Sequence, residues 1–271
     1  MSASLSFGVQ GIALLGPGLP DWARAAPLLR EPSRWQRAAT VVPAPALLPA
    51  TERRRAGNVV KASVAVADAA CQAAGLAPTA LATVFSSSTG DPANCHAMCE
   101  ALAQAERVVS PTRFTNSVHN VTAGIWHIAT HAMTASTSLG AFDASFAAGL
   151  LEAAVQCVHG QAPVLLVACD VPYPEPLHGK RPLPDSFATA LVLVPQGGRR
   201  LALALAGDAP ATPCADAGLE ALRTQIPAAR ALPLLQALAG TAAAQLIVEG
   251  LPQQALAVAV NADAAAEEEG R

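Results

Sequence analysis

Three side chains with metal-binding chemistry lie within five consecutive residues, at Cys95, His96 and Cys99. Two residues four apart share one face of a helix, and thiolate together with imidazole suits zinc. A zinc site needs three or four ligands, however, and no second pair lies at zinc-finger spacing. We therefore expect small buried thiols at this place, and no metal or other cofactor.

A second set of side chains has the chemistry of a Ser-His-Asp hydrolase or acyltransferase. Ser145, or one of the serines at 86–88, would be the nucleophile, with His119 as the base and Asp143 as the acid. The sequence contains no GxSxG nucleophile elbow, and it also lacks GxGxxG, GxxxxGK[ST], SxxK and HExxH. A free-standing serine enzyme is therefore an alternative without a supporting motif.

Two further groups of residues each have two interpretations. His127 and His131 lie four apart on an expected helix and would suit a metal or a proton relay, but hydrogen-bonded imidazoles are the commoner case. The run Arg53 to Arg55 would attract an acidic protein surface, such as an acyl carrier protein, or would simply face solvent. We expect hydrogen-bonded histidines and solvated arginines.

Composition limits the class of protein. The formal net charge is -3, and aromatic residues make up 4% of the 271 residues, which argues against a nucleic-acid partner. Hydrophobic residues make up 52%, enough for a large core, but no apolar run reaches the roughly 20 residues of a membrane span. The six cysteines are scattered and no basic leader precedes the first apolar residues, so we expect a cytoplasmic protein with reduced thiols.

Hydrophobic periodicity predicts alternating strands and helices. The expected strands are 7–16, 82–85, 134–142, 164–168, 187–194, 201–206 and 255–260, and the clearest expected helices are 58–74, 93–106 and 146–160. Polar loops follow several strands, notably 86–91, and such loops hold ligands in α/β proteins. Strands 187–194 and 201–206 flank Gln196-Gly197-Gly198 and are expected to form a hairpin.

The predicted fold class is α/β, with a mixed, mostly parallel sheet covered by helices. We expect three parts along the chain: a main domain at 1–206, a helical and strand extension at 207–262 packed on it, and a disordered acidic tail at 263–271.

Four segments in order, FSSSTGD (85–91), SPTRFTNSVHNVTAG (110–124), TSLGAFDASFAAGLLEA (137–153) and VLLVACDVP (164–172), resemble the ketosynthase-like family of the thiolase superfamily. More narrowly, they resemble its short N-terminal-half members, the chain-length factors of aryl polyene and xanthomonadin-type pigment pathways. The resemblance covers roughly residues 7–206 and implies half of a thiolase-like fold.

In catalytic members of this family, a strand ends in an acyl-accepting cysteine that begins a helix. The resemblance places Asp143 at that position, where it cannot carry a thioester; a helix N-cap is the other interpretation of this residue. The family's two catalytic histidines, in His-Gly-Thr and Asn-x-x-Gly-His contexts, have no counterpart in this sequence. The resemblance therefore implies a subunit that is not catalytic alone.

The implied role is docking on an active β-ketoacyl synthase and shaping its acyl tunnel, during fatty acid or polyketide extension on an acyl carrier protein. The strand at 134–142 would then pair across the dimer axis. Candidate tunnel or interface residues are Phe114, His119, Asn120, Phe142 and Phe146, with ordinary core as the alternative for the phenylalanines. A homodimeric acyl-binding scaffold is a third hypothesis.

Overall fold

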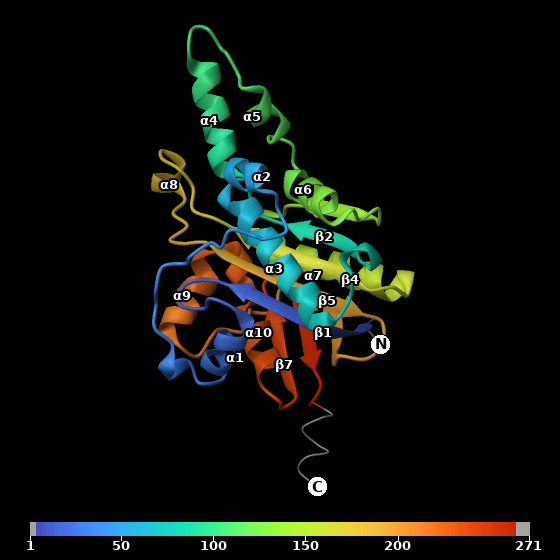
Figure 1. Ribbon diagram of the computed structural model, residues 1–271. Helices are drawn as coiled ribbons and strands as arrows, with labels where there is room; N and C mark the ends of the chain where they lie inside the picture. Colours follow the sequence, from blue (N-terminus) through green and yellow to red (C-terminus); the bar gives the residue numbers. More distant parts are fainter. Residues whose placement is uncertain (1–3, 264–271) are drawn as a thin grey trace.

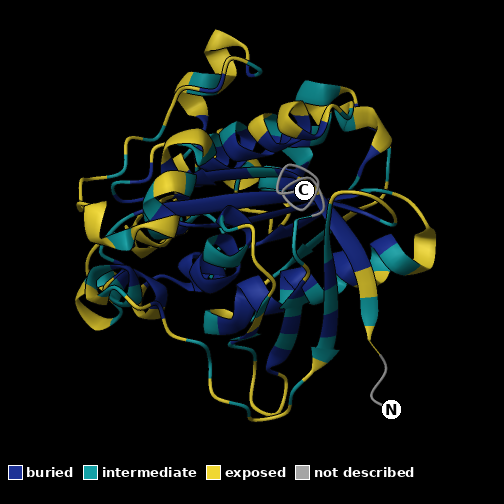
Figure 2. Cartoon of the chain, turned by 90° about the horizontal axis from the view of Figure 1, so that it is seen from below, coloured by how far each residue is buried: buried dark blue, intermediate teal, exposed yellow. Residues whose placement is uncertain are grey.

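One eight-stranded sheet forms the centre of the computed structural model, which describes residues 4–263 (Figure 1). The strand order is β3-β2-β4-β5-β1-β6-β8-β7. The strands are β1 (Leu5–Leu15), β2 (Ala82–Ser86), β3 (Ser136–Leu139), β4 (Val164–Asp170), β5 (Phe187–Val194), β6 (Arg199–Leu205), β7 (Ala244–Val248) and β8 (Leu256–Val260). β4 and β5 are buried along their whole length. Figure 2 shows dark blue strands in the interior and the exposed yellow segments around them. The sheet therefore carries helices on both faces.

Two hydrophobic clusters lie on opposite faces of the sheet. On one face, α3 (Asn58–Ala74) packs over β1, β4 and β5, and α6 (Val121–Thr130) packs against α3. On the other face lies α7 (Ser145–Gly160), together with α1 (Trp22–Arg30), α9 (Ala217–Gln225), η4 (Pro227–Ala231) and α10 (Leu232–Ala239). The remaining short helices are η1 (Pro32–Arg34), α2 (Ala50–Arg55), η2 (Pro78–Ala80), α5 (Pro111–Thr115), η3 (Phe142–Ala144) and α8 (Leu177–Lys180).

The sheet is mixed, but the expectation that it is mostly parallel is wrong. Among the described strands, only β2 pairs in parallel, with β3 and with β4, while the pairs β4–β5, β5–β1, β1–β6, β6–β8 and β8–β7 are antiparallel. The expected hairpin of 187–194 and 201–206 is also wrong. The first strand of the chain inserts between them, pairing with β6 through Leu5–Val9 and with β5 through Gly8–Leu15.

The C-terminal segment continues this sheet. β8 pairs with β6, and its bounds agree to within one residue with the strand expected at 255–260. The helices α9, η4 and α10 share one hydrophobic cluster with α7. Most of the leucines in this segment are buried on that cluster, including Leu219, Leu232 and Leu235. The face of α7 is thus covered by the chain itself. Most of the tail expected at 263–271 lies outside the described residues.

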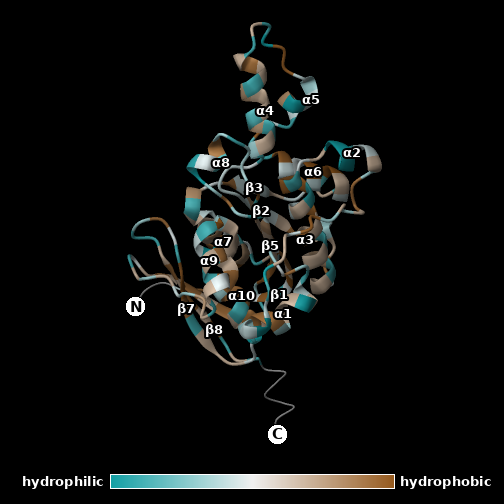
Figure 3. Cartoon of the chain, turned by 90° about the vertical axis from the view of Figure 1, so that its left-hand side faces the viewer, coloured by the Kyte–Doolittle hydropathy of each residue, from teal (hydrophilic) through white to brown (hydrophobic). Residues whose placement is uncertain are grey.

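An arm formed by α4 (Pro92–Ala103) and α5 projects from the body of the molecule, as Figures 1 and 3 both show. Asp91 caps α4 by accepting a hydrogen bond from the Asn94 amide at 3.0 Å, and Pro92 occupies the first helical position. Residues 102–108, at the outer end of the arm, are exposed throughout. The arm therefore has no hydrophobic core of its own.

Candidate functional site

A tight turn connects β3 to α7, and the backbone of Phe142 adopts the left-handed region there, with φ at 51°. Ser145 holds this turn from inside. Its Oγ donates to the Phe142 carbonyl at 2.7 Å and accepts from the Ala141 amide at 3.0 Å. Because Ser145 is buried and both interactions are local, it is part of the turn and not an exposed nucleophile.

Asp143 follows in this turn and does not cap α7. The N-cap of α7 is Ala144, which makes no side-chain cap, so the N-cap interpretation of Asp143 is wrong. Instead, the Asp143 carboxylate pairs with the Arg181 guanidinium and lies 3.5 Å from Nη2 of Arg230. The side chain of Arg230 is only 9% exposed. The carboxylate is therefore held between two cations from distant parts of the chain.

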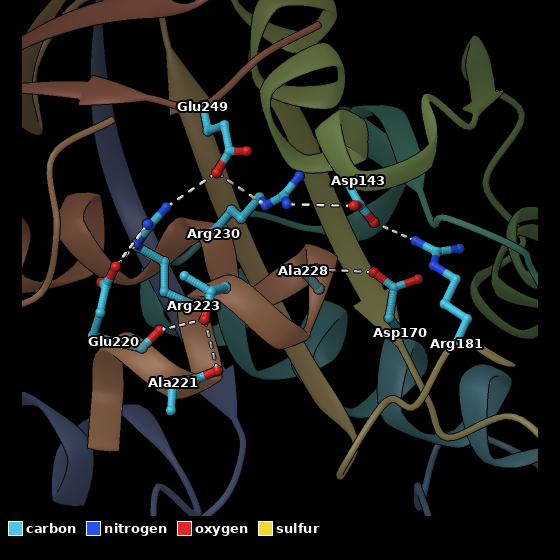
Figure 4. A network of polar contacts seen from close by, with 10 residues as sticks. Asp143, Asp170, Arg181, Glu220, Ala221, Arg223, Ala228, Arg230 and Glu249 are labelled. Atoms are coloured by element: carbon cyan, nitrogen blue, oxygen red, sulfur yellow. Dashed lines mark hydrogen bonds and ion pairs between the residues drawn. The ribbon is translucent and has the colours of Figure 1, made fainter. Parts of the chain in front are cut away.

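The ion pairs continue away from this turn into the C-terminal segment (Figure 4). Arg230 Nε lies 3.3 Å from Glu249 Oε2, in ion-pair contact without hydrogen-bond alignment. Arg223 lies 3.2 Å from the same Glu249 oxygen and bonds Glu220 through two nitrogens, each at 2.8 Å. Hydrogen bonding to Arg223 lowers the pKa of the Glu220 carboxyl. The network thus joins α9, η4 and the end of β7 to the α7 turn.

Asp170, the last residue of β4, supplies a second connection to the C-terminal segment. Its carboxylate accepts hydrogen bonds from the Ser88 amide at 2.8 Å, the Ser87 hydroxyl at 3.1 Å and the Ala228 amide at 2.9 Å. Burial raises the pKa of Asp170 to about 6, although these hydrogen bonds act in the opposite direction. Asp170 therefore fixes η4 against the loop after β2.

The segment 171–186 crosses over the α7 turn. Arg181 Nη1 donates to the Tyr173 hydroxyl at 2.8 Å, and that hydroxyl is 3.1 Å from Ser88 Oγ. The Arg181 guanidinium also lies 3.8 Å from the centre of the Phe142 ring. The Asp143 carboxylate, at the position where the family resemblance expects a nucleophile, is thus paired with arginines of the chain itself, while its side chain remains 42% exposed.

A serine-type catalytic arrangement does not assemble. His119 is exposed and its Nε2 contacts the Ser138 carbonyl at 2.9 Å. Ser86 Oγ is buried without a hydrogen-bond partner, against Gly149 of α7. Within residues 4–263, no hydrogen bond joins His119 to Ser145 or to serines 86–88.

The other histidine and cysteine candidates do not form a shared site either. His127 contacts the Ala132 carbonyl at 3.1 Å and the Thr83 hydroxyl at 3.0 Å, as expected for a hydrogen-bonded imidazole, and His131 ends α6 in the left-handed region. Cys95 and Cys99 are exposed on α4, so the expectation of buried thiols is wrong there. The described residues contain no group of three or more His, Cys, Asp or Glu placed to hold a metal ion.

The interface candidates fall into two environments. Phe146 is fully buried in the core under α7, which favours the core alternative for this residue. Phe114 and Phe142 are 68% and 61% exposed, and His119 and Asn120 are exposed just before α6. The structure therefore separates Phe146 from the other four.

Exposed apolar side chains also gather on the elements next to β3, whose outer edge has no neighbouring strand within the described sheet. We define the β3-edge surface as that edge together with three exposed side chains on the segment that leads into β3, namely Val118, Ile128 and Met133. Ile128 and Met133 are 77% and 95% exposed. An open strand edge beside exposed apolar side chains is typical of a protein interface.

Sequence reasoning missed Arg181, Arg223, Arg230 and Glu249, which form most of the charged network. The one available signal was Arg230, an isolated charge in the apolar run 226–239. A charged residue in such a run is rarely buried unless it is paired. No helix among the described residues is long and apolar enough to cross a membrane.

Solved structures share this architecture. The ketosynthase ApeO in complex with its chain length factor ApeC, from Xenorhabdus doucetiae, matches with a TM-score of 0.73 at 22% identity, covering 94% of this chain and 99% of the matched chain. The ishigamide ketosynthase/chain length factor matches with a TM-score of 0.69 at 12% identity, covering 95% and 99%. A β-ketoacyl synthase from Burkholderia phymatum matches with a TM-score of 0.52 at 16% identity, covering 72% of this chain but 59% of the matched chain.

Among curated protein sequences, none matches the chain. A family model does match: the model of the β-ketoacyl synthase N-terminal domain aligns with residues 27–253, which is most of the chain. The fold agrees with this match, since the ketosynthase structures above share the mixed sheet and its covering helices. The chain therefore belongs to the β-ketoacyl synthase N-terminal domain family.

Proposed function

We propose that this chain is a non-catalytic, ketosynthase-like subunit of the chain-length-factor type. It binds an active β-ketoacyl synthase and shapes the tunnel that receives the growing acyl chain. The observation that carries the proposal is the Asp143 carboxylate, which pairs with Arg181 and Arg230 at the position that the family resemblance aligns with the nucleophile. A carboxylate held in this way cannot accept an acyl group as a thioester.

The two cysteines of α7 and β4 do not replace a nucleophile at the turn. Burial raises the pKa of Cys157 to about 11 and that of Cys169 to about 12, so both remain protonated near neutral pH. An acyl-accepting cysteine needs the thiolate form. These two buried thiols therefore offer no thiolate, and in this proposal the partner supplies the nucleophile.

Two features support docking through the β3-edge surface. The free edge of β3 can extend the sheet into a partner by strand pairing, and the exposed apolar side chains beside it gain burial on association. In contrast, the face of α7 is already covered by the C-terminal segment. We propose that residues 7–206 provide the partner-binding surface and that residues 207–262 close the half-fold behind it.

The substrate class follows from the proposed partner. The acyl chain would be a fatty acid or polyketide, of the aryl polyene type, carried in the cytoplasm by an acyl carrier protein. Solved complexes of similar fold pair a ketosynthase with a chain length factor. Arg53, Arg54 and Arg55 make no ion pair among the described residues and suit an acidic carrier protein.

The test is co-expression of this chain with each catalytic ketosynthase of the source genome. A tag on this chain should recover one of them as a stable heterodimer. Malonyl-dependent elongation on acyl carrier protein should then require both chains. Failure to bind any ketosynthase, or elongation that is identical without this chain, would refute the proposal.

The free edge of β3 also suits a homodimer, the second candidate, in which two copies bind an acyl chain without a ketosynthase. Size-exclusion chromatography with light scattering separates the two cases. The heterodimer proposal expects the purified chain to convert fully to a 1:1 complex when the ketosynthase is added. A homodimer that resists this conversion would favour the scaffold.

A further inference from the structure

The strained residue of the α7 turn is an exposed aromatic. Phe142 has φ at 51°, a conformation that costs a bulky L-residue of the order of 1–3 kcal/mol. Its side chain is 61% exposed, so burial in the isolated chain does not offset this cost. Strain of this kind persists only where surrounding contacts impose it, and it concentrates at functional sites.

Two residues impose the conformation of Phe142. Ser145 Oγ bonds the backbone on both sides of the turn, through the Ala141 amide and the Phe142 carbonyl. Arg181 fixes the side chain, because its guanidinium lies 3.8 Å from the ring centre. One face of the ring is therefore covered by a cation, while much of the ring remains open to a partner.

Arg181 is itself held on several sides. It pairs with Asp143, donates to the Tyr173 hydroxyl at 2.8 Å and lies 5.5 Å from the centre of the Tyr173 ring. Tyr173 is buried and contacts Ser88. The planar guanidinium can satisfy these contacts at once, whereas a lysine ammonium cannot. Arg181 thus links the segment after β4, the α7 turn and the Phe142 ring.

We propose that Arg181 is a positioning residue that pre-organises Phe142 as the anchor of the interface, with the ring entering an apolar pocket on the ketosynthase. This inference rests on the proposed function. Aromatic anchors carry a large share of interface affinity, and holding one in its bound conformation removes part of the entropic cost of binding. Asp143 then acts as the counterion of Arg181 in place of a nucleophile.

The test is a double-mutant cycle on the affinity for the ketosynthase recovered by co-expression. Phe142→Ala should weaken binding at least 30-fold and Arg181→Ala about 10-fold, with Arg181→Lys between wild type and Arg181→Ala. The double variant should bind as Phe142→Ala alone does, because Arg181 acts through the ring. Arg24→Ala, which removes a 75% exposed cation, is the matched control and should bind as wild type.

A second measurement needs no partner. In protein labelled with fluorinated phenylalanine, the 19F signal of Phe142 should shift and broaden in Arg181→Ala, while the signal of the buried Phe146 should not move. Additive losses in the cycle, or an unchanged Phe142 signal, would show a merely structural role and overturn the inference. Wild-type binding with no loss in either single variant would also overturn it, while leaving the proposed function intact. Absence of wild-type binding would instead refute both.

Discussion

The α7 turn and the β3-edge surface lie close in the chain but differ in how their side chains are satisfied. At the turn, Asp143 has two arginine partners within the chain and lies beneath the segment 171–186. At the β3-edge surface, Ile128 and Met133 are 77% and 95% exposed, and the backbone edge of β3 is open.

This difference separates a paired ionic site from an open apolar surface. At the α7 turn, Asp143 is an ion-paired carboxylate and offers no thiolate to a substrate. The region where a partner would dock has unburied apolar area and unpaired backbone groups. This distribution supports the binding role proposed above.

The largest expected effect comes from placing charge on the β3-edge surface. The double variant Ile128→Asp, Met133→Asp should weaken ketosynthase binding about 1,000-fold, roughly 4 kcal/mol, because two carboxylates would have to be desolvated in the complex. The thermal midpoint of the isolated chain should stay within a few degrees, since both sites are exposed. Leu251→Asp, at another exposed apolar site, is the control in a titration by biolayer interferometry. An equal loss of affinity in Leu251→Asp would show that the β3-edge surface has no special role in binding.

The buried carboxylate of Asp170, near the α7 turn, should make the free energy of unfolding depend on pH. Its folded pKa of about 6 exceeds the ordinary value of 3.8, so the folded state binds the proton more tightly. The resulting stabilisation is complete below pH 4 and is lost as the pH rises through 6, a decrease of about 3 kcal/mol in the free energy of unfolding.

Urea denaturation of wild type and Asp170→Asn at several pH values between 4 and 7.5 measures this decrease. The difference between the two proteins should change across that window, whereas Asp21→Asn at the surface should follow wild type. A constant difference would mean that Asp170 keeps its ordinary pKa.

Removing Arg230 should have a smaller effect on stability. Arg230→Ala separates Asp143 from Glu249 and deletes a nearly buried side chain, which should cost about 2 kcal/mol in urea unfolding. The cost stays moderate because both carboxylates are about 40% exposed and can be hydrated. Arg34→Ala, in an exposed pair with Glu31, should change stability by less than about 0.5 kcal/mol. Equal effects of the two variants would show that the ion pairs of Arg230 contribute no more to stability than an exposed surface pair.

The smallest effect tests the electrostatics of the turn itself. A thiol introduced by Asp143→Cys would lie near Arg181 and Arg230, and neighbouring cations lower a thiol pKa. Its rate of alkylation by iodoacetamide at pH 7 should exceed that of the exposed Cys99 by about tenfold, since a pKa lower by one raises the thiolate fraction by that factor. A slower rate than at Cys99, followed by peptide mass spectrometry, would contradict this environment.

Local patterns in the sequence were sufficient for most elements but not for their pairing. The helix at 58–74 and the strand at 187–194 appear with the expected bounds, because each combines a clear apolar pattern with a glycine or polar boundary. The expected hairpin failed because the glycines between β5 and β6 indicate a turn, but not which strand lies between them. Non-local insertion of β1 leaves no local signal.

The candidate site shows the same division. The family motifs identified the turn at Asp143, but its partners Arg181 and Arg230 lie 38 and 87 residues further along the chain. A single sequence does not show which of 17 basic residues reach a given carboxylate. The sequence also could not predict which phenylalanine is exposed. Phe142 and Phe146 are four residues apart, yet Phe142 lies at the surface and Phe146 in the core.

The position of β1 also determines when the protein can fold. This strand is synthesised first, yet its neighbours β5 and β6 begin at Phe187 and Arg199. The nascent chain must therefore carry β1 without either neighbour until residues 187–205 have been synthesised. Such late, long-range closure is slow and exposes nascent chains to aggregation, so chaperone supply and translation rate should govern the yield of folded subunit.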